Sequence, residues 1–331
     1  MQILDTVGID MSKLNFDVRI HSTQSYAQFE NSNKGFKKLI IWTYKNSSFA
    51  RENIFFVLEH TGLYSHKISV YLTENKILFA LVPGLEIKRS LGLSRGKDDK
   101  VDATNIAKYA YRLRDEIKPY KMPSEQLQSL KRLLSLRDRL VKQRAGFKSS
   151  LKEENRILIK KENHVLFKSQ EKMVDYLTKQ IEILEKEMMG IIKSDELLIT
   201  QFRLIVSIKG VGMQTALFMI AYTHAFTKFE NWRKFASYCG VAPFPNMSGT
   251  SIRGKTKVSN LANKRIKSLL DLCAKCAIQR NMEMKIYYNR RIDEGKNKMS
   301  TINIIRNKLL SRIFAVVNRS TPYIDMMKYA A

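Results

Sequence analysis

The chain has 331 residues, and its 58 lysines and arginines outnumber its 31 aspartates and glutamates to give a formal net charge of +27. A positive charge of this size, spread along the whole length, favours a polyanionic partner. Nucleic acid is the first candidate for that partner, and an acidic membrane surface is the second. No window of about 18 apolar residues is present, and the first residues run straight into a predicted strand, so the sequence predicts neither a membrane span nor a signal peptide.

Residues 1–122 alternate apolar strand patterns with amphipathic helix patterns, which predicts an α/β domain. Ile54–Glu59 is a continuous apolar run, typical of a central strand that is buried on both faces. Between the last strand and the last helix of this domain we predict a basic loop that includes Arg95 and Lys97. The predicted strands are 7–10, 15–20, 25–31, 54–59 and 77–82, the predicted helices begin at Asn33, after Gly62 and at Asp99, and the loop also carries Lys88, Arg89 and Lys100.

Four acidic residues of this domain are candidates for one common site. Asp10 and Glu59 each end an apolar strand, and two such strands side by side in a sheet bring their ends together. Asp99 and Asp102 stand three residues apart at a helix start, so both project from one face. Carboxylates that converge in this way repel one another unless a cation lies between them, and Mg²⁺ prefers oxygen ligands. The alternative, equally compatible with the pattern, is ordinary helix caps and a solvated strand end.

Residues 123–194 carry Leu, Lys, Arg and Glu at helical spacing, without strand alternation. The apolar residues of the second half step by four and three, as in a coiled-coil seam, and those of the first half suit a partner helix. We predict two long antiparallel helices, and the spacing leaves open whether they pair within one chain or between two. The seam residues are Leu177, Ile181, Leu184, Met188 and Ile191 against Leu130, Leu133, Leu140, Phe147 and Leu151, with Arg137 and Arg144 interrupting.

A compact helical domain is predicted from residue 195 to the end. Its apolar start leads through Lys209, Gly210 and Gly212 into an apolar helix over Thr215–Tyr222. A Gly-x-Gly turn between helices exposes backbone N–H groups at a helix start, which is a way to hold a phosphate. The turn resembles the helix-hairpin-helix motif of non-specific DNA binders. The alternative is a plain tight turn between two buried helices.

The three cysteines all lie in this domain and are too few and too unevenly spaced for a disulfide framework. Cys239 is distant from the other two in the sequence. Cys273 and Cys276 lack a second pair of ligands, so we interpret them as two thiols on a helix face and not as a zinc site. This cysteine usage predicts an intracellular protein.

Residues 238–255 form a predicted loop that is dense in Pro, Gly and hydroxyl groups and carries several cations. Ser248, with Arg253 and Lys255 nearby, is a candidate nucleophile that would attack a phosphodiester and hold it as a phosphoserine ester. Serine is a weak nucleophile at neutral pH and needs a base, a cation or a metal, and His224 is distant in the sequence. The alternative is a surface loop that only contacts phosphates.

Six short motifs occur in a fixed order along nearly the whole chain. They are Gly8-Ile9-Asp10-Met11-Ser12-Lys13, Glu59-x-Thr61-Gly62-x-Tyr64, Asp99-x-x-Asp102-Ala103, Ile208-Lys209-Gly210-Val211-Gly212, Gly240-Val241-Ala242-Pro243 and Ser248-Gly249. In order and spacing they resemble the DEDD transposases of the IS110 insertion sequences and the related Piv-type DNA invertases. The resemblance implies an α/β RNase H-like (RuvC-like) domain over 1–122, a coiled-coil helical arm over 123–194 and a mainly α-helical transposase domain over 195–331.

The resemblance also implies roles for individual residues. Asp10, Glu59, Asp99 and Asp102 match the acids that bind Mg²⁺ or Mn²⁺, and Ser248 matches the catalytic serine, with Ser251 as a close alternative. The implied function is a transposase or site-specific recombinase acting on the double-stranded DNA of element ends and target, with a structured guide RNA from the element. A homodimer or tetramer in the bacterial cytoplasm, associated with the nucleoid and not with a membrane, is expected. The expected nucleic-acid contacts are Lys209, Gly210, Gly212, Arg253, Lys255, Arg95 and Lys97.

Two other functions are weighed against this one. A metal-dependent nuclease of the Holliday-junction resolvase type would use the four acids alone and would keep cutting DNA in a Ser248→Ala variant. An architectural nucleic-acid binder without catalytic activity would leave the acids as caps, and Asp10→Asn would then change no DNA activity.

Overall fold

The structure is a computed structural model that describes residues 2–90, 92, 99–249 and 252–325, with the backbone alone at residues 99, 248, 252 and 253. The chain divides into two compact units, Met1–Met122 and Pro123–Ala331. Each unit has its own hydrophobic core, and each is described by itself below.

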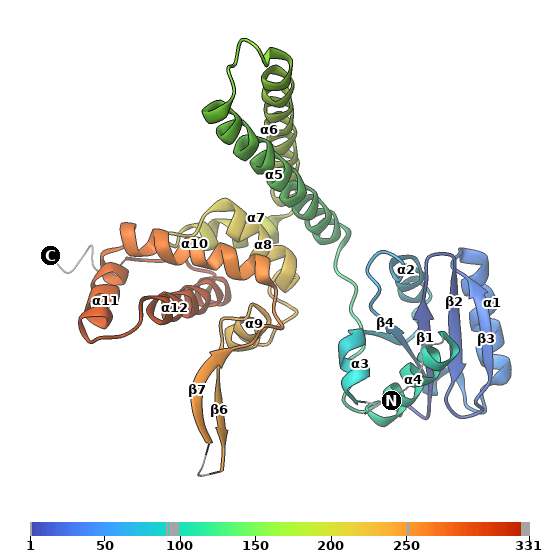
Figure 1. The fold of residues 1–331 in the computed structure, drawn as a ribbon. Helices are drawn as coiled ribbons and strands as arrows, with labels where there is room; N and C mark the ends of the chain where they lie inside the picture. Colours follow the sequence, from blue (N-terminus) through green and yellow to red (C-terminus); the bar gives the residue numbers. More distant parts are fainter. Residues whose placement is uncertain (1, 91, 93–98, 250–251, 326–331) are drawn as a thin grey trace. The chain divides into compact units, whose positions relative to one another are not determined.

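The first unit is built on a five-stranded mixed sheet with the order β3-β2-β1-β4-β5 (Figure 1). Neighbours β1, β2 and β3 are antiparallel, as expected for strands joined by short turns, whereas β1, β4 and β5 are parallel and joined through helices. The parallel pairing of β1 with β4 places the two acid-ending strands side by side, as predicted. The strands are β1 (Asp5–Met11), β2 (Asn15–Ile20), β3 (Tyr26–Glu30), β4 (Ile54–Glu59) and β5 (Phe79–Val82).

Helices cover both faces of this sheet, so the central strand β4 is buried on each side. Phe56 and Leu58 pack into the core under α1 and α2, while Phe55 and Val57 pack into a second core under α3 and α4. Burial on both faces explains why β4 is a continuous apolar run. The helices are α1 (Asn33–Asn46), the 3₁₀ turn η1 (Arg51–Asn53), α2 (His66–Glu74), α3 (Gly84–Ser90) and α4 (Asp99–Arg112).

The prediction of a basic loop after β5 is wrong for its first part, because residues 84–90 form helix α3. Glu86 lies in the first turn and Lys88 and Arg89 in the last, so the charges match the helix dipole. The Tyr109 hydroxyl donates a hydrogen bond to Glu86 at 2.6 Å and ties α3 to α4. The predicted contacts Arg95 and Lys97 lie outside the described residues.

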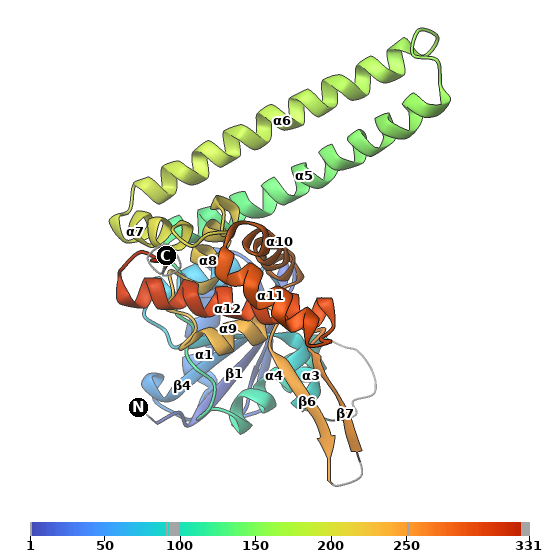
Figure 2. The ribbon, with the colours of Figure 1, turned by 90° about the vertical axis from the view of Figure 1, so that its left-hand side faces the viewer.

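Two long helices, α5 (Glu125–Ile157) and α6 (His164–Lys193), form an antiparallel hairpin within one chain (Figure 2). The two arginines that interrupt the predicted seam have partners on α6. Arg137 donates through Nε to Glu185 at 2.7 Å, and Arg144 donates to the Thr178 hydroxyl at 3.2 Å. These contacts explain how cations fit between two apolar helix faces. None of the described helices has both the length and the apolar character that a membrane crossing requires.

The rest of the second unit is a cluster of helices around α8, which is buried along nearly its whole length. The base of the helical hairpin packs into the same core through Leu127, Leu130 and Leu134 of α5 and Met188 and Ile192 of α6. The helices are α7 (Glu196–Val206), α8 (Met213–Thr223), α9 (Trp232–Tyr238), α10 (Lys264–Arg280), α11 (Met282–Asp293) and α12 (Lys298–Arg319).

The prediction of a loop over residues 238–255 is wrong, because a two-stranded antiparallel hairpin forms there. Its strands are β6 (Pro243–Ser248) and β7 (Ile252–Val258). The prolines at 243 and 245 indicated a loop, but both strands of a two-stranded sheet are edges, where proline is tolerated.

Candidate active site and nucleic-acid interface

Asp10 and Glu59 lie at the carboxyl ends of neighbouring parallel strands. The register pairs Ile9 with Leu58, so Asp10 and Glu59 are the next residues along β1 and β4. Because side chains alternate along a strand, Asp10 shares the face of Gly8, which is the face covered by α3 and α4. Both acids are partly buried. The structure therefore brings these two predicted site residues to one edge and one face of the sheet.

Helix α4 crosses this face and brings a third acid toward the same edge. The Thr6 hydroxyl donates to the Ala107 carbonyl at 3.0 Å, and a Cβ at Gly8 would lie 2.5 Å from the Ala103 carbonyl oxygen. Residues of β1 that are closer to Asp10 therefore face residues of α4 that are closer to the first turn of this helix. Asp102 lies in that turn and is partly buried. Asp99 begins the helix, and its side chain lies outside the described part of the chain.

The side chain of Glu59 occupies the space above the first residue of α3. A Cβ at Gly84 would lie 2.0 Å from Glu59 Oε1, so the carboxylate lies directly against this glycine and a larger residue would displace it. This contact places the Glu59 carboxylate beside the first turn of α3.

One acid near this edge, Asp17, was missed by the sequence reasoning. It lies in β2 directly opposite Asp10 and is 4% exposed. Its carboxylate accepts hydrogen bonds from the Tyr26 hydroxyl and from Gln28 Nε2, the latter at 3.2 Å. An ionisable residue between the apolar Phe16 and Val18 is unusual in a buried strand, and this signal could have identified it.

The acids at this edge offer only oxygen ligands, and this donor chemistry fits Mg²⁺ or Mn²⁺. Across the described residues, no three Asp, Glu, His or Cys side chains are grouped closely enough to hold a metal ion. Asp10, Glu59 and Asp102 therefore share a face of the sheet without being gathered around one point, and the fourth predicted ligand, Asp99, is not described beyond its backbone.

The predicted helix-hairpin-helix turn lies between α7 and α8. Gly210 has φ +94°, a left-handed conformation that favours glycine, and Gly212 is the exposed residue that precedes α8 without a side-chain cap. Lys209 already has a partner, since its Nζ lies 2.7 Å from Asp325 Oδ2. Burial raises the pKa of the nearby Cys273 thiol. Hydrogen bonds with Thr215 and the Gly212 backbone act in the opposite direction, and burial is the larger effect.

The predicted nucleophile Ser248 is the last residue of β6 and pairs with Ile252 of β7. The structure describes its backbone and that of Arg253, whereas Ser251 lies outside the described residues. Lys255 on β7 is exposed, and so is Met247, with 68% of its surface accessible. The hairpin is therefore an exposed arm with a cation and an apolar side chain near the predicted serine.

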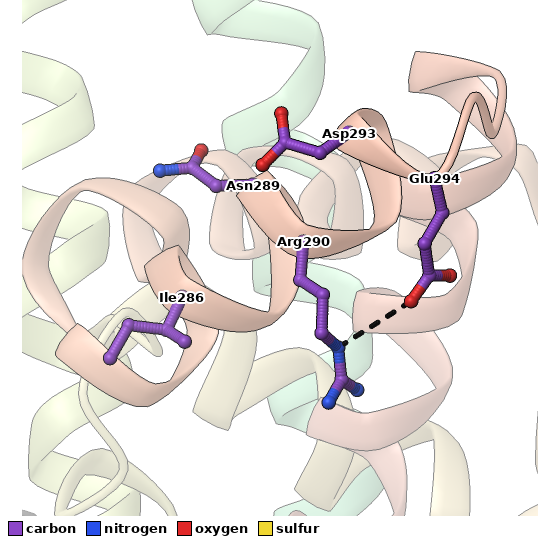
Figure 3. Close-up of a pocket in the computed structure, with 5 residues that line it drawn as sticks. All are labelled: Ile286, Asn289, Arg290, Asp293 and Glu294. Carbon is purple, nitrogen blue, oxygen red and sulfur yellow. Dashed lines mark ion pairs between the residues drawn. The ribbon is translucent and has the colours of Figure 1, made fainter.

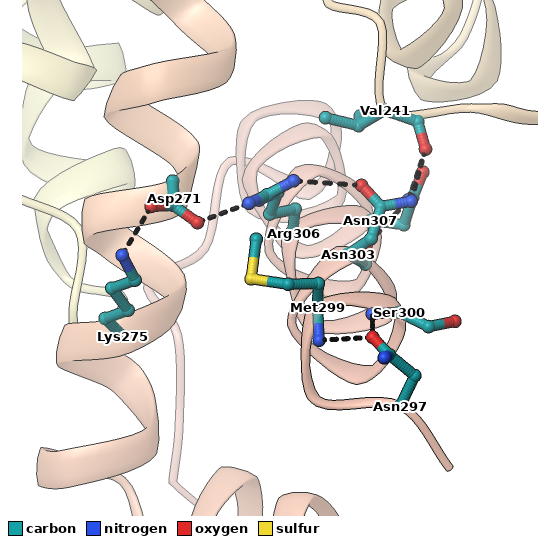
Figure 4. A network of polar contacts seen from close by, with 9 residues as sticks. All are labelled: Val241, Asp271, Lys275, Asn297, Met299, Ser300, Asn303, Arg306 and Asn307. Carbon is teal, nitrogen blue, oxygen red and sulfur yellow. Dashed lines mark hydrogen bonds and ion pairs between the residues drawn. The ribbon is translucent and has the colours of Figure 1, made fainter. Parts of the chain in front are cut away.

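The base of this hairpin is fixed on helix α12 (Figure 4). The Val241 carbonyl, two residues before β6, accepts hydrogen bonds from Asn303 Nδ2 and Asn307 Nδ2, each at 2.9 Å. Arg306, which is nearly buried, donates to Asn303 Oδ1 at 3.3 Å and forms an ion pair with Asp271 of α10. These contacts hold the start of β6 on α12 and tie α12 to α10.

The other end of the hairpin is tied to α9. Asn263, which caps the start of α10, donates from its backbone N–H to the Tyr238 carbonyl at 2.9 Å. Its Nδ2 donates to the Tyr238 hydroxyl at 3.2 Å. Both ends of the exposed arm are thus anchored to the helical core.

A hollow of about 580 Å³ on α11 contains none of the predicted site residues (Figure 3). Arg290 Nε lies 3.8 Å from Glu294 Oε1 on one side of it, and Asn289 and Asp293 point to the other. We assign this hollow no part in the site.

Comparisons with known proteins match both units. A family model described as a transposase matches residues 7–154, and a second, described as the transposase IS116/IS110/IS902 family, matches residues 202–289. The pilin gene-inverting proteins of Moraxella bovis and Moraxella lacunata are each 26% identical over 325 residues, which is 96% of this chain and 97% of theirs. An uncharacterized protein of insertion element IS110 from Streptomyces coelicolor is 29% identical over 121 residues, covering 37% of this chain and 30% of that one.

The two matched regions contain the features described above. The first includes the sheet, its acidic edge and helix α4, and the second includes the helix-hairpin-helix turn and the β6–β7 hairpin. The matches in this order along one chain agree with the resemblance of the six motifs. The chain belongs to the IS110 family of transposases.

Proposed function

We propose that this transposase cuts and rejoins DNA strands through Ser248, with a divalent metal held by Asp10, Glu59, Asp99 and Asp102. Membership of the family implies a recombinase that cleaves DNA. The observation that supports the metal site best is the placement of Asp10 and Glu59 on neighbouring strand ends, beneath the helix that begins with Asp99 and carries Asp102. Oxygen ligands arranged at a sheet edge suit Mg²⁺ or Mn²⁺.

In the proposed reaction the Ser248 hydroxyl oxygen attacks a backbone phosphorus of DNA. A bond forms between Oγ and phosphorus, the bond from phosphorus to one sugar oxygen breaks, and the serine proton ends on the released sugar hydroxyl. A sugar hydroxyl from another strand then attacks the phosphoserine ester, which restores the serine and joins the new strands. Two displacements of this kind conserve the number of phosphodiester bonds.

Mg²⁺ bound by the four acids would neutralise charge on the phosphate under attack. Without a metal the same carboxylates would repel the phosphate, so the acids and the cation are proposed to act together. The exposed Lys255 and the backbone of the Gly210–Gly212 turn would bind neighbouring phosphates.

The proposal extends to the organisation of the complex. We propose an RNase H-like (RuvC-like) domain over 1–122, a coiled-coil arm over 123–194 and a transposase domain over 195–331, assembled as a homodimer or tetramer. A structured RNA from the element would select the DNA by base pairing, while the protein holds the backbone.

A covalent-trapping assay tests the proposal. Wild-type protein, Ser248→Ala, Ser251→Ala and Asp10→Asn are incubated with DNA of the element ends, with and without the element's non-coding RNA, in Mg²⁺ or in EDTA. Denaturing gels then separate protein–DNA adducts from cleaved DNA.

The expected result is an adduct in wild type and Ser251→Ala that is lost in Ser248→Ala, in Asp10→Asn and in EDTA. Cleaved DNA without an adduct, still produced by Ser248→Ala, would instead leave a nuclease that uses the acids alone. Adducts that form equally without RNA would remove the guide from the proposal and leave the serine in place.

A further inference from the structure

Two lysines and a histidine of the second unit lie near one another, and both lysines contact aromatic rings. Lys131 belongs to α5, His224 caps the end of α8 and Lys228 lies in the following loop. Lys131 Nζ lies 5.0 Å from the centre of the Tyr222 ring, and Lys228 Nζ lies 5.6 Å from the centre of the Tyr238 ring. Both distances are in the range of cation–π contacts. We call Lys131, His224 and Lys228 the lysine cluster.

Lys131 lies close enough to Lys228 and His224 to disfavour their charged forms. Burial lowers the pKa of Lys228, and Lys131 lowers it further. Burial also lowers the pKa of His224 to about 4, with additional effects of Lys228 and Lys131. The His224 ring is neutral near pH 7, so the ammonium groups of Lys131 and Lys228 are the two cations that share this site.

The nearby carboxylates are engaged with other cations. Asp138 accepts two hydrogen bonds from Arg265, both at 2.7 Å, and Glu230 forms an ion pair with Lys234. Among the residues that the structure describes, neither Lys131 nor Lys228 takes part in an ion pair. Burial covers part of both lysines, but each residue keeps enough exposed surface for an anion from outside to reach it.

The backbone beside the lysine cluster is held in an unfavourable conformation. His224, Ala225 and Phe226 have φ of +50°, +52° and +65°, a left-handed region that residues with a Cβ rarely adopt. Gln201 Nε2 donates to the Ala225 carbonyl at 3.1 Å, and the Phe226 N–H donates to the Thr223 hydroxyl at 3.0 Å. The surrounding contacts therefore maintain the turn that presents His224 next to Lys228.

The lysine cluster adjoins the base of the hairpin that carries Ser248. Tyr238 contacts Lys228 through its ring and accepts both hydrogen bonds of Asn263, which follows β7. Strand β6 spans about 17 Å from its first residue to Ser248, at about 3.3 Å per residue. The lysine cluster therefore lies on the helices that anchor the hairpin, at the opposite end of β6 from Ser248.

We propose that Lys131, Lys228 and His224 form a binding site for a backbone phosphate of double-stranded DNA, next to the base of the β6–β7 hairpin. The phosphate would supply the negative charge that the chain itself does not place there, and the aromatic rings would orient the two ammonium groups. The inference rests on the proposed function in taking the DNA to be cut as the polymer that is bound.

Lysine acetylation of the wild-type protein tests the site directly. The rates at Lys131, Lys228 and Lys234 are followed by mass spectrometry, without nucleic acid, with a mixed-sequence DNA duplex and with single-stranded RNA of the same length. DNA is expected to slow acetylation severalfold at Lys131 and Lys228 and to leave Lys234, which is paired with Glu230, unchanged. Equal rates with and without DNA, or protection by RNA alone, would overturn the proposal.

A pair of double variants supplies the second test. Lys131→Gln with Lys228→Gln removes the two charges of the cluster, whereas Lys234→Gln with Lys275→Gln removes two charges that are already in ion pairs. The first variant should bind DNA about tenfold more weakly than the second and show a salt dependence that is less steep by about one to two phosphate contacts.

Identical affinities and salt slopes for the two double variants would contradict the site. If the cluster variant does not fold, the acetylation result on wild type decides alone. Neither test requires DNA cleavage, so a wild-type protein that binds in this way but forms no serine adduct would refute the proposed function and keep the phosphate site.

Discussion

Gly8 of β1 lies directly beneath Ala107 of α4, where a Cβ at position 8 would be 2.3 Å from the Ala107 nitrogen. We expect Gly8→Ala to push α4 off the sheet, lower the free energy of unfolding by about 1–3 kcal/mol and shift Asp102 relative to Asp10. Urea unfolding and metal-dependent DNA cleavage measure the two effects.

The matched control is Gly146→Ala in α5, where a Cβ would meet no atom within 4 Å. It should leave cleavage unchanged and stabilise the chain by up to about 1 kcal/mol, because alanine favours helix over glycine. A Gly8→Ala protein as stable and active as wild type would show that α4 does not set the spacing of the acids.

Asn303 and Asn307 are expected to position the Ser248 hairpin. Replacing both with alanine leaves the Val241 carbonyl without these two donors, which should cost about 1–3 kcal/mol of stability and slow adduct formation. DNA affinity should stay near that of wild type, since neither side chain is a cation. The exposed Asn318 of the same helix provides the control substitution. Adduct formation at the wild-type rate would refute a positioning role.

Asp325 forms an ion pair with Lys209, the cation of the helix-hairpin-helix turn. We expect Asp325→Asn to release Lys209 for a DNA phosphate, so that affinity rises and the salt dependence steepens by about one contact. Asp293→Asn on α11 makes the same change of net charge at an exposed position and serves as the comparison. Weaker binding by Asp325→Asn than by Asp293→Asn would mean that the ion pair supports the turn instead of masking it.

His224 should make the stability of the second unit depend on pH. Its pKa of about 4 in the folded chain lies below the ordinary 6.5, so the unfolded state takes up the proton first as pH falls. The stability contributed by the neutral ring is therefore complete above pH 6.5 and is lost progressively toward pH 4. Unfolding of wild type and His224→Gln across this range should diverge at the low end. Parallel curves would contradict the lowered pKa.

Much of the first unit follows from hydrophobic patterning. Strands 15–20 and 54–59 and the helix that begins at Asn33 are confirmed at the predicted residues, because burial of one or both faces fixes their apolar periods. Helix α3 was missed because seven residues are too few for a helical period, and its contact with Tyr109 is distant in sequence.

In the second unit, several contacts between residues distant in sequence cannot be predicted from the hydrophobic pattern. The intrachain pairing of α5 with α6 depends on contacts such as Arg137 with Glu185, which a seam pattern leaves undecided. The lysine cluster unites residues nearly a hundred positions apart, and no local signal distinguishes Lys131 or Lys228 from the other cations of a strongly basic chain. Ion pairs such as Lys209 with Asp325 are equally invisible before the fold is known.

The long helical hairpin has a mechanical consequence. Its α5 strut is clamped in the core as far as Leu134 and runs on to Ile157, about 35 Å farther at 1.5 Å per residue. A rigid lever of that length, turned by about 10° at its fulcrum, carries its tip through about 6 Å. Lys131 lies within the clamped segment, at the fulcrum. A small rotation of the clamped segment, such as one caused by a ligand at Lys131, would therefore become a large displacement at the far end of the hairpin.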